Sequence, residues 1–183
     1  MFKSGFVTVI GRPNVGKSTL LNQLIGEKIS IISDKPQTTR NKIHLVYTDD
    51  QMQAVFLDTP GIQMPKNKLG DYMLNVSEST LQEVDVVTFM VDVSEEIGKL
   101  DSYILEKLRK IETPIILLIN KIDTIEDEEV NKLIDKYLQL NMFHSIIPIS
   151  AKDDDNLNIY METLYDIFEE GPMYYPEDMI TDQ

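Results

Sequence analysis

Five short runs of apolar, mostly β-branched residues recur along the chain, and each is bounded by Gly, Pro, Asn or Asp. They occupy residues 6–10, 54–57, 86–91, 115–119 and 146–149. Continuous apolar runs of this length are typical of strands that are buried on both faces of a sheet. The pattern therefore predicts a sheet whose strands lie in the interior of the protein.

Segments with helical spacing lie between these runs. The apolar positions that define them are Leu20, Leu21, Leu24 and Ile25; Leu100, Ile104, Leu105 and Leu108; Val130, Leu133, Ile134 and Tyr137; and Leu157, Tyr160, Met161, Leu164, Ile167 and Phe168. Each set falls on one side of a 3.6-residue helix. Alternating strands and helices predict an α/β fold, a doubly wound and mainly parallel sheet with helices on both faces.

One further strand is expected to run against the others. Residues 43–48 and 53–57 are two extended patterns joined by the polar pair Asp49 and Asp50, which is typical of an antiparallel connection. The whole sheet is then expected to have six strands, with one antiparallel edge strand. Residues 30–42 and 61–70 show no periodicity, which favours functional loops.

Composition narrows the kind of protein. A chain of 183 residues with 42% hydrophobic content can bury one core, so we expect one domain. The absence of cysteine excludes disulfides and thiolate metal sites and suits the cytoplasm. No apolar run approaches membrane-spanning length, so we expect a soluble chain. The net charge of −14 disfavours binding of nucleic acid by electrostatics alone.

The first predicted turn carries a phosphate-binding pattern, G-x-x-x-x-G-K-S, between a buried strand and a helix. It comprises Gly11, Arg12, Pro13, Asn14, Val15, Gly16, Lys17 and Ser18, and Thr19 follows. The glycines let the backbone curl so that N–H groups at the positive end of the helix dipole face phosphate. Lys17 is placed for the outer phosphates and Ser18 for a magnesium ion. This is the P-loop of nucleotide triphosphatases.

Three more motifs follow buried strands, where open sheets bind ligands. Asn120, Lys121, Ile122 and Asp123 resemble the guanine-specificity motif of GTPases. The resemblance implies that Asp123 accepts hydrogen bonds from guanine, that Lys121 packs along the base and that Asn120 ties this loop to the phosphate loop. Ser150, Ala151 and Lys152 resemble the remaining guanine-side motif, which implies a contact from the Ala151 N–H to the guanine carbonyl. Asp58, Thr59, Pro60 and Gly61 resemble the loop that holds magnesium and senses the terminal phosphate.

Taken in order, GRPNVGKST, PQTTRNK, DTPGI, NKID and SAK closely resemble the Era family, bacterial GTPases that act in assembly of the small ribosomal subunit. The resemblance spans essentially the whole chain. It implies a GTP- and GDP-binding switch with magnesium ligands at Ser18, Thr39 and Asp58, although Thr38 stays open as a substitute for Thr39. The implied catalytic residues are Lys17, Thr39, Gly61 and Asn14.

Ile62 stands where Ras-type enzymes carry the glutamine that orients the attacking water. Related GTPases with an apolar residue there are often activated by potassium, which implies an ion site formed by Asn14 and the backbone of residues 33–38. A structural role for Asn14, shaping its loop, stays open. So does a nucleotide-binding module with negligible hydrolysis.

The last residues resemble the segment that leads into the C-terminal KH-type RNA-binding domain of Era proteins. We therefore expect a GTP-binding domain at residues 1–170 and a linker at 171–183, with contacts to 16S rRNA and the 30S subunit made through a KH domain outside this chain. The resemblance also leaves open peripheral membrane association of the longer protein, and we expect this part to be monomeric. The alternative families are tRNA-modification and tandem-domain ribosome-assembly GTPases.

Overall fold

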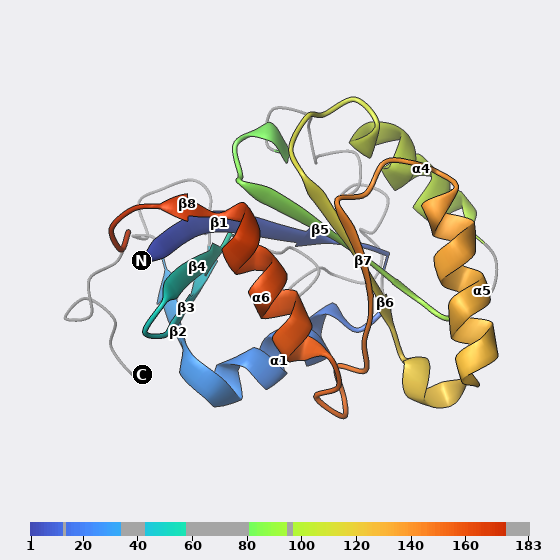
Figure 1. Cartoon of the computed structure of the whole chain (residues 1–183), viewed down its shortest axis with the longest axis horizontal. Coiled ribbons are helices and arrows are strands. Elements are labelled where there is room, and N and C mark those ends of the chain that lie inside the picture. The colour runs from blue at the N-terminus through green and yellow to red at the C-terminus, as the bar shows by residue number, and fades with distance from the viewer. Residues whose placement is uncertain (13, 34–42, 58–80, 95–96, 175–183) are drawn as a thin grey trace.

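A computed structural model describes residues 1–12, 14–33, 43–57, 81–94 and 97–174, which form a mixed sheet flanked by helices (Figure 1). The strands are β1 (Lys3–Ile10), β2 (Ile29–Ser33), β3 (Ile43–Thr48), β4 (Met52–Phe56), β5 (Val86–Asp92), β6 (Ile115–Asn120), β7 (Ser145–Pro148) and β8 (Glu169–Glu170). The helices are α1 (Lys17–Lys28), α4 (Lys99–Leu108), α5 (Asp127–Leu138) and α6 (Leu157–Ile167), with a short 3-10 helix, η3 (Ile122–Thr124).

The strand order confirms the predicted doubly wound sheet. Within the described residues the order is β2-β3-β4-β1-β5-β6-β7, and β8 pairs with β1. Neighbours from β4 through β7 run parallel, whereas β3 runs antiparallel to both β2 and β4. The antiparallel pairing of residues 43–48 with the strand that follows is therefore confirmed.

Among the described residues the sheet has eight strands, two more than the six that the sequence predicts. Residues 30–33 were expected to begin a loop, but they belong to β2, which covers the outer edge of β3, so β3 is not an edge strand. The sequence ISIIS follows α1 without a Gly or Pro to separate strand from helix, which hides the boundary. The second addition, β8, has only two residues and both are exposed glutamates.

Apolar side chains alternate between the two faces of the central strands. On β5, Val86 and Met90 pack into the core beneath α1 and α6. The intervening side chains Val87, Phe89 and Val91 pack into the core beneath α4 and α5. Figure 1 shows these two helix pairs on opposite sides of the strands. Both faces are apolar because both are covered, which explains the continuous hydrophobic runs in the sequence.

The carboxyl ends of the parallel strands share one edge of the sheet. Asp92 at the end of β5 lies in register with Asn120 at the end of β6, and Ile119 lies in register with Pro148 of β7. The loops after β1, β6 and β7 therefore come together, although they are far apart in sequence. These are the loops that carry three of the predicted motifs.

The opposite end of the sheet holds the last described residues. The Ser4 hydroxyl donates to the carbonyl of Pro172 at 2.8 Å, and the Tyr174 N–H donates to Oε1 of Gln53 at 2.8 Å. The Tyr174 ring lies 4.4 Å from the ring of Phe6, centroid to centroid. Residues 171–174 form no regular element but follow the amino ends of β1 and β4. A domain boundary at residue 170 stays a prediction.

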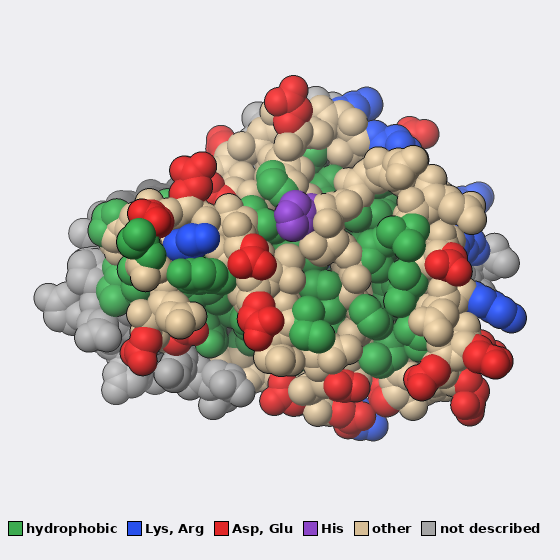
Figure 2. All heavy atoms as spheres, viewed as in Figure 1, with side chains coloured by type: hydrophobic (Ala, Val, Ile, Leu, Met, Phe, Trp, Pro, Cys, Tyr) green, Lys and Arg blue, Asp and Glu red, His purple; other side chains and the backbone are tan. Residues whose placement is uncertain are grey.

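Acidic side chains are spread over the face seen in Figure 2 and gather along its lower rim. This distribution agrees with the acidic composition of the chain. Among the helices of the described part of the chain, none has the length and apolar character needed to cross a bilayer.

Candidate nucleotide-binding site

The phosphate loop runs from the end of β1 to the start of α1, as predicted. Two of its residues have left-handed backbone conformations, Asn14 at φ 69° and Gly16 at φ 110°. A Cβ atom on Gly16 would lie 2.1 Å from Nδ2 of Asn120, so this position accepts only glycine. The close approach shows that the phosphate loop and the loop after β6 are packed directly against each other.

Lys17 is the first residue of α1, at the end of this loop, and is buried, with 6% of its surface exposed. Its Nζ donates to the carbonyl of Gly11. Burial lowers the pKa of Lys17 to about 8, because the ammonium loses solvation there. An anionic ligand would stabilise the charged form, and the first turn of α1 has no acidic residue to compete for it. The position suits phosphate.

Asn120 joins three loops in one hydrogen-bonded unit. Its Nδ2 donates to the carbonyl of Val15 at 2.8 Å, and its Oδ1 accepts from the N–H of Ala151 at 2.9 Å. The side chain is buried, with 3% exposed, so both bonds are made away from water. The predicted tie between Asn120 and the phosphate loop is confirmed.

Lys121 makes a second tie to the phosphate loop. It adopts a left-handed conformation with φ 72°, and its Nζ donates to the carbonyl of Asn14 at 2.7 Å. This bond places the end of the Lys121 side chain at the phosphate loop. The sequence resemblance implies packing of Lys121 along the base, which stays a prediction.

Asp123 is exposed at the rim of the same loop, on η3. The hydroxyl of the buried Ser150 donates to Asp123 Oδ1 at 2.9 Å, which fixes the orientation of the carboxylate. A fixed, accessible carboxylate can accept two parallel hydrogen bonds from a ring N–H and an amine. Guanine offers that pair of donors.

The loop after β7 carries Ala151, whose predicted contact with guanine stays a prediction. The N–H of Ala151 was expected to reach the guanine carbonyl, but in this structure it donates to Asn120. A contact with guanine would therefore have to share or replace that bond. Lys152 is exposed, and its carbonyl accepts a hydrogen bond from Gln23 of α1 at 2.9 Å, which sequence analysis did not predict.

Several predicted site residues lie outside the described part of the chain. They are Pro13, Thr38, Thr39, Asp58, Thr59, Pro60, Gly61 and Ile62, and most of the potassium loop at 33–38. Of the three predicted magnesium ligands only Ser18 is described. It is exposed on the first turn of α1 beside Lys17, and a hydroxyl oxygen is a suitable ligand for magnesium, so the described part of the site fits the metal.

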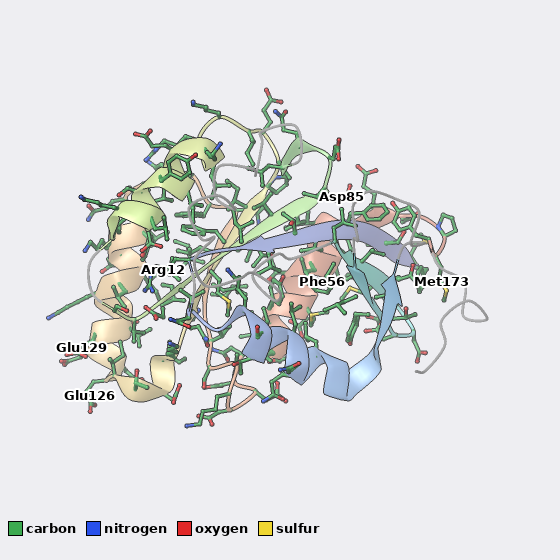
Figure 3. All side chains as sticks on the ribbon, turned by 180° about the vertical axis from the view of Figure 1, so that it is seen from behind. Arg12, Phe56, Asp85, Glu126, Glu129 and Met173 are labelled. Carbon is green, nitrogen blue, oxygen red and sulfur yellow. The ribbon has the colours of Figure 1, made fainter. Side chains whose placement is uncertain are left out.

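Arg12 was predicted to be a nucleotide-binding residue, and that role stays a prediction. In this structure its guanidinium binds protein groups. The guanidinium pairs with Asp92 at 2.7 Å and with Asp101 of α4 at 3.3 Å, and it donates to Ser94 at 3.2 Å. Figure 3 shows Arg12 at the end of the sheet remote from Met173. Asp92 was not among the predicted site residues, although its place at the carboxyl end of a buried strand was a signal.

The environment of Asp92 keeps it ionised. Burial raises the pKa of its carboxyl group, but the hydrogen bonds from Ser94 and the charges of Arg12 and Lys121 outweigh burial and leave the pKa below its usual value. Asp92 therefore adds a fixed negative charge behind the predicted binding loops, next to two cations.

A mainly parallel sheet with a phosphate loop after its first strand defines a P-loop nucleotide-binding fold. The model of the 50S ribosome-binding GTPase family matches residues 6–121, and the chain belongs to that family. Within the family it is similar to GTPase Era of Alkaliphilus metalliredigens, at 56% identity, and of Clostridioides difficile, at 53% identity. Both alignments cover 100% of this chain and 62% of the relative.

Solved structures give the same result. A crystal structure of Era in complex with MgGDPNP and nucleotides 1506–1542 of 16S ribosomal RNA matches with a TM-score of 0.79 and 42% identity, covering 100% of this chain and 63% of that one. A single-substitution variant of Aquifex aeolicus Era bound to GDP·AlF4⁻ matches with a TM-score of 0.78 and 41% identity, covering 100% and 62%. The resemblance to Era is confirmed, and this chain spans about three fifths of the length of these relatives.

Proposed function

We propose that this chain binds GTP and GDP together with magnesium and hydrolyses GTP slowly, as a conformational switch. The observation that carries the proposal is the hydrogen-bonded unit around Asn120, which joins a phosphate loop to a loop that presents a fixed carboxylate, Asp123. A ligand that spans both must have phosphates at one end and a pair of hydrogen-bond donors at the other. Guanine nucleotides meet both requirements, whereas adenine has no matching donors.

The residues divide the task between them. Lys17 binds the outer phosphates, and the N–H groups of the phosphate loop and α1 stabilise their negative charge. Ser18 holds magnesium together with Thr39 and Asp58, whose roles come from the family resemblance. A bound magnesium ion neutralises charge on the phosphates during transfer. Gly61 senses the terminal phosphate through its N–H.

Hydrolysis also requires a positioned attacking water and compensation of the negative charge that develops on the phosphates, and Ile62 cannot position water as glutamine does. We propose that a potassium ion held by Asn14 supplies the additional positive charge. Two observations support this proposal. Asn14 is exposed and has a left-handed backbone conformation, and its carbonyl already accepts a hydrogen bond from Lys121. The side chain of Asn14 remains accessible to a ligand.

The wider role follows from the relatives. The Era structure that contains a 16S rRNA segment supports a function in small-subunit assembly. By the sequence resemblance, this function would be exerted through a KH domain outside this chain. The net charge of −14 agrees with RNA contacts made outside this chain. We also propose a cytoplasmic location, with peripheral membrane association and oligomeric state as properties to be measured on the longer protein.

Release of phosphate from magnesium-GTP tests the proposal directly. The chain and an Asn14→Asp variant are compared in matched potassium and sodium buffers, with Asn141→Asp as the control, because Asn141 is also left-handed but lies after α5. We expect faster release in potassium, lost in Asn14→Asp and retained in Asn141→Asp. Release that is absent over hours, with GTP still bound, would instead establish the second candidate that Ile62 favours, a binding module without hydrolysis.

A further inference from the structure

Asp92 occupies a shared position between the two halves of the nucleotide site. It is the last residue of β5, its backbone lies in register with Asn120, and its surface is 7% exposed. Its two carboxylate oxygens face different cations. Oδ1 pairs with Arg12 of the phosphate loop at 2.7 Å, and Oδ2 pairs with Lys121 of the loop after β6 at 3.4 Å.

Lys121, the second of these cations, has an uncommon backbone conformation. Lys121 has φ 72° and its ammonium also binds the carbonyl of Asn14, which has φ 69°. Left-handed residues persist when surrounding contacts hold them in place. A lysine side chain that loses one of two partners regains rotamer freedom, so the carboxylate of Asp92 restricts where the ammonium of Lys121 can lie.

The remaining contacts show that the carboxylate itself is held firmly. Ser94 donates to Asp92 Oδ1 through its backbone N–H at 3.0 Å and through its hydroxyl. Arg12 is fixed on its other side by Asp101 of α4, which is buried and also accepts from the N–H of Gly98 at 3.4 Å. Asp92 is thus a rigid anchor rather than a surface charge.

From this geometry we propose that Asp92 is a positioning residue for guanine-nucleotide binding, which preorganises the phosphate loop and the guanine loop by holding Arg12 and Lys121 together. The proposal rests on the proposed function, since it concerns the same site. Asp92 touches no nucleotide. It holds the two loops in place before the nucleotide binds. Binding then costs less conformational entropy, which raises the affinity.

This role separates affinity from base selectivity. Loss of Asp92 loosens both loops for every nucleotide that uses Lys121, whereas the preference for guanine over hypoxanthine depends on the exocyclic amine facing Asp123. GDP and inosine diphosphate should therefore weaken by the same factor. A defect at Asp123 would instead reduce the ratio of the Kd for inosine diphosphate to the Kd for GDP.

The test is a set of equilibrium titrations with GDP and inosine diphosphate on the chain and on Asp92→Asn. We expect the Kd of both ligands to rise about tenfold, with an unchanged ratio. The matched control is Asp85→Asn, just before the amino end of the same strand, because Asp85 also accepts a backbone hydrogen bond, from Phe6 at 2.7 Å, but lies far from the site (Figure 3). Its Kd values should equal those of the unsubstituted chain.

A double-mutant cycle distinguishes positioning from general destabilisation. In a Lys121→Met background the further effect of Asp92→Asn should fall to about twofold, because the group it positions is gone. An equal, tenfold effect in both backgrounds would overturn the proposal, and so would an unchanged Kd in Asp92→Asn. If Asp92→Asn fails to fold by circular dichroism, Arg12→Gln replaces it, and an unchanged Kd there has the same consequence. An unsubstituted chain that binds neither ligand would refute the proposed function instead.

Discussion

The two ends of the sheet are built in contrasting ways. At the carboxyl end, polar groups meet in left-handed turns, and Asn120 and Lys121 hold the loops through hydrogen bonds to backbone carbonyls. At the amino end, apolar packing joins the hydrogen bonds, and the ring of Phe168 is so close to Gly5 that a Cβ there would lie 2.3 Å from it. We therefore expect substitutions at the carboxyl end to change mainly the Kd for nucleotide. Substitutions at the amino end should change mainly the free energy of unfolding.

The largest effect on folding is expected from Phe168→Ala. Phe168 is 2% exposed and packs in the core beneath α6, so its removal should lower the free energy of unfolding by about 4 kcal/mol. The Kd for GDP of the folded fraction should not change, because the site lies at the far end. Urea denaturation measures the first quantity and titration the second.

Tyr174→Ala provides the graded control at the same end. Its ring is half-exposed and contacts Phe6, so we expect a loss of only about 1 kcal/mol. A weakened GDP affinity in Phe168→Ala, with the folded fraction accounted for, would show that the two ends are not independent.

The next largest effect belongs to the binding end. Gly16→Ala would force a methyl group against Nδ2 of Asn120 at φ 110°, so we expect the Kd for GDP to rise at least about 100-fold. Gly98→Ala is the matched control, because a Cβ there meets nothing nearer than Asp101 at 4.0 Å. If both variants bind GDP as the unsubstituted chain does, the close packing of the two loops does not matter for binding.

A smaller effect is expected at Lys17, whose burial lowers the stability of the nucleotide-free protein. Its folded pKa of about 8 lies below the ordinary lysine value of 10.5, so the unfolded chain binds more protons between these values and this lysine opposes folding below pH 8. The penalty is relieved as the pH rises from about 8 to 10.5. Lys17→Met should therefore raise nucleotide-free stability by about 2 kcal/mol at pH 7, after the lost bond to Gly11 is allowed for.

The pH dependence provides the check on that prediction. Between about pH 8 and 10 the stability of the unsubstituted chain should rise relative to that of Lys17→Met, as measured by thermal or urea unfolding without nucleotide. A constant difference between the two proteins across this range would mean that Lys17 is not titrating in the folded state.

The sequence predicted the binding end better than the opposite end, for a physical reason. Loops such as 11–18 and 120–123 are short, contiguous and constrained by backbone geometry, so their chemistry is visible in the order of residues. β8 consists of two glutamates, and Tyr174 follows a short irregular segment that begins with Gly171 and Pro172, so neither carries a periodic signal. Their positions depend on partners such as Gln53, which lies 121 residues from Tyr174.

The role of Asp92 was missed for a related reason. Its partners Arg12 and Lys121 lie 80 and 29 residues away, and only the strand register brings the three together. β2 was missed because a helix passes directly into it without a breaker. Thr39, Asp58 and Gly61 lie outside the described residues, so their predicted roles stay predictions.

Competition between nucleotides for the site tests the central claim most directly. A fluorescent GDP analogue is bound to the chain in magnesium buffer and displaced with GDP or with ADP. We expect GDP to displace it and ADP to require at least about 100-fold higher concentration, because adenine leaves the carboxylate of Asp123 unpaired. Displacement by ADP and GDP at equal concentrations would contradict guanine recognition at Asp123.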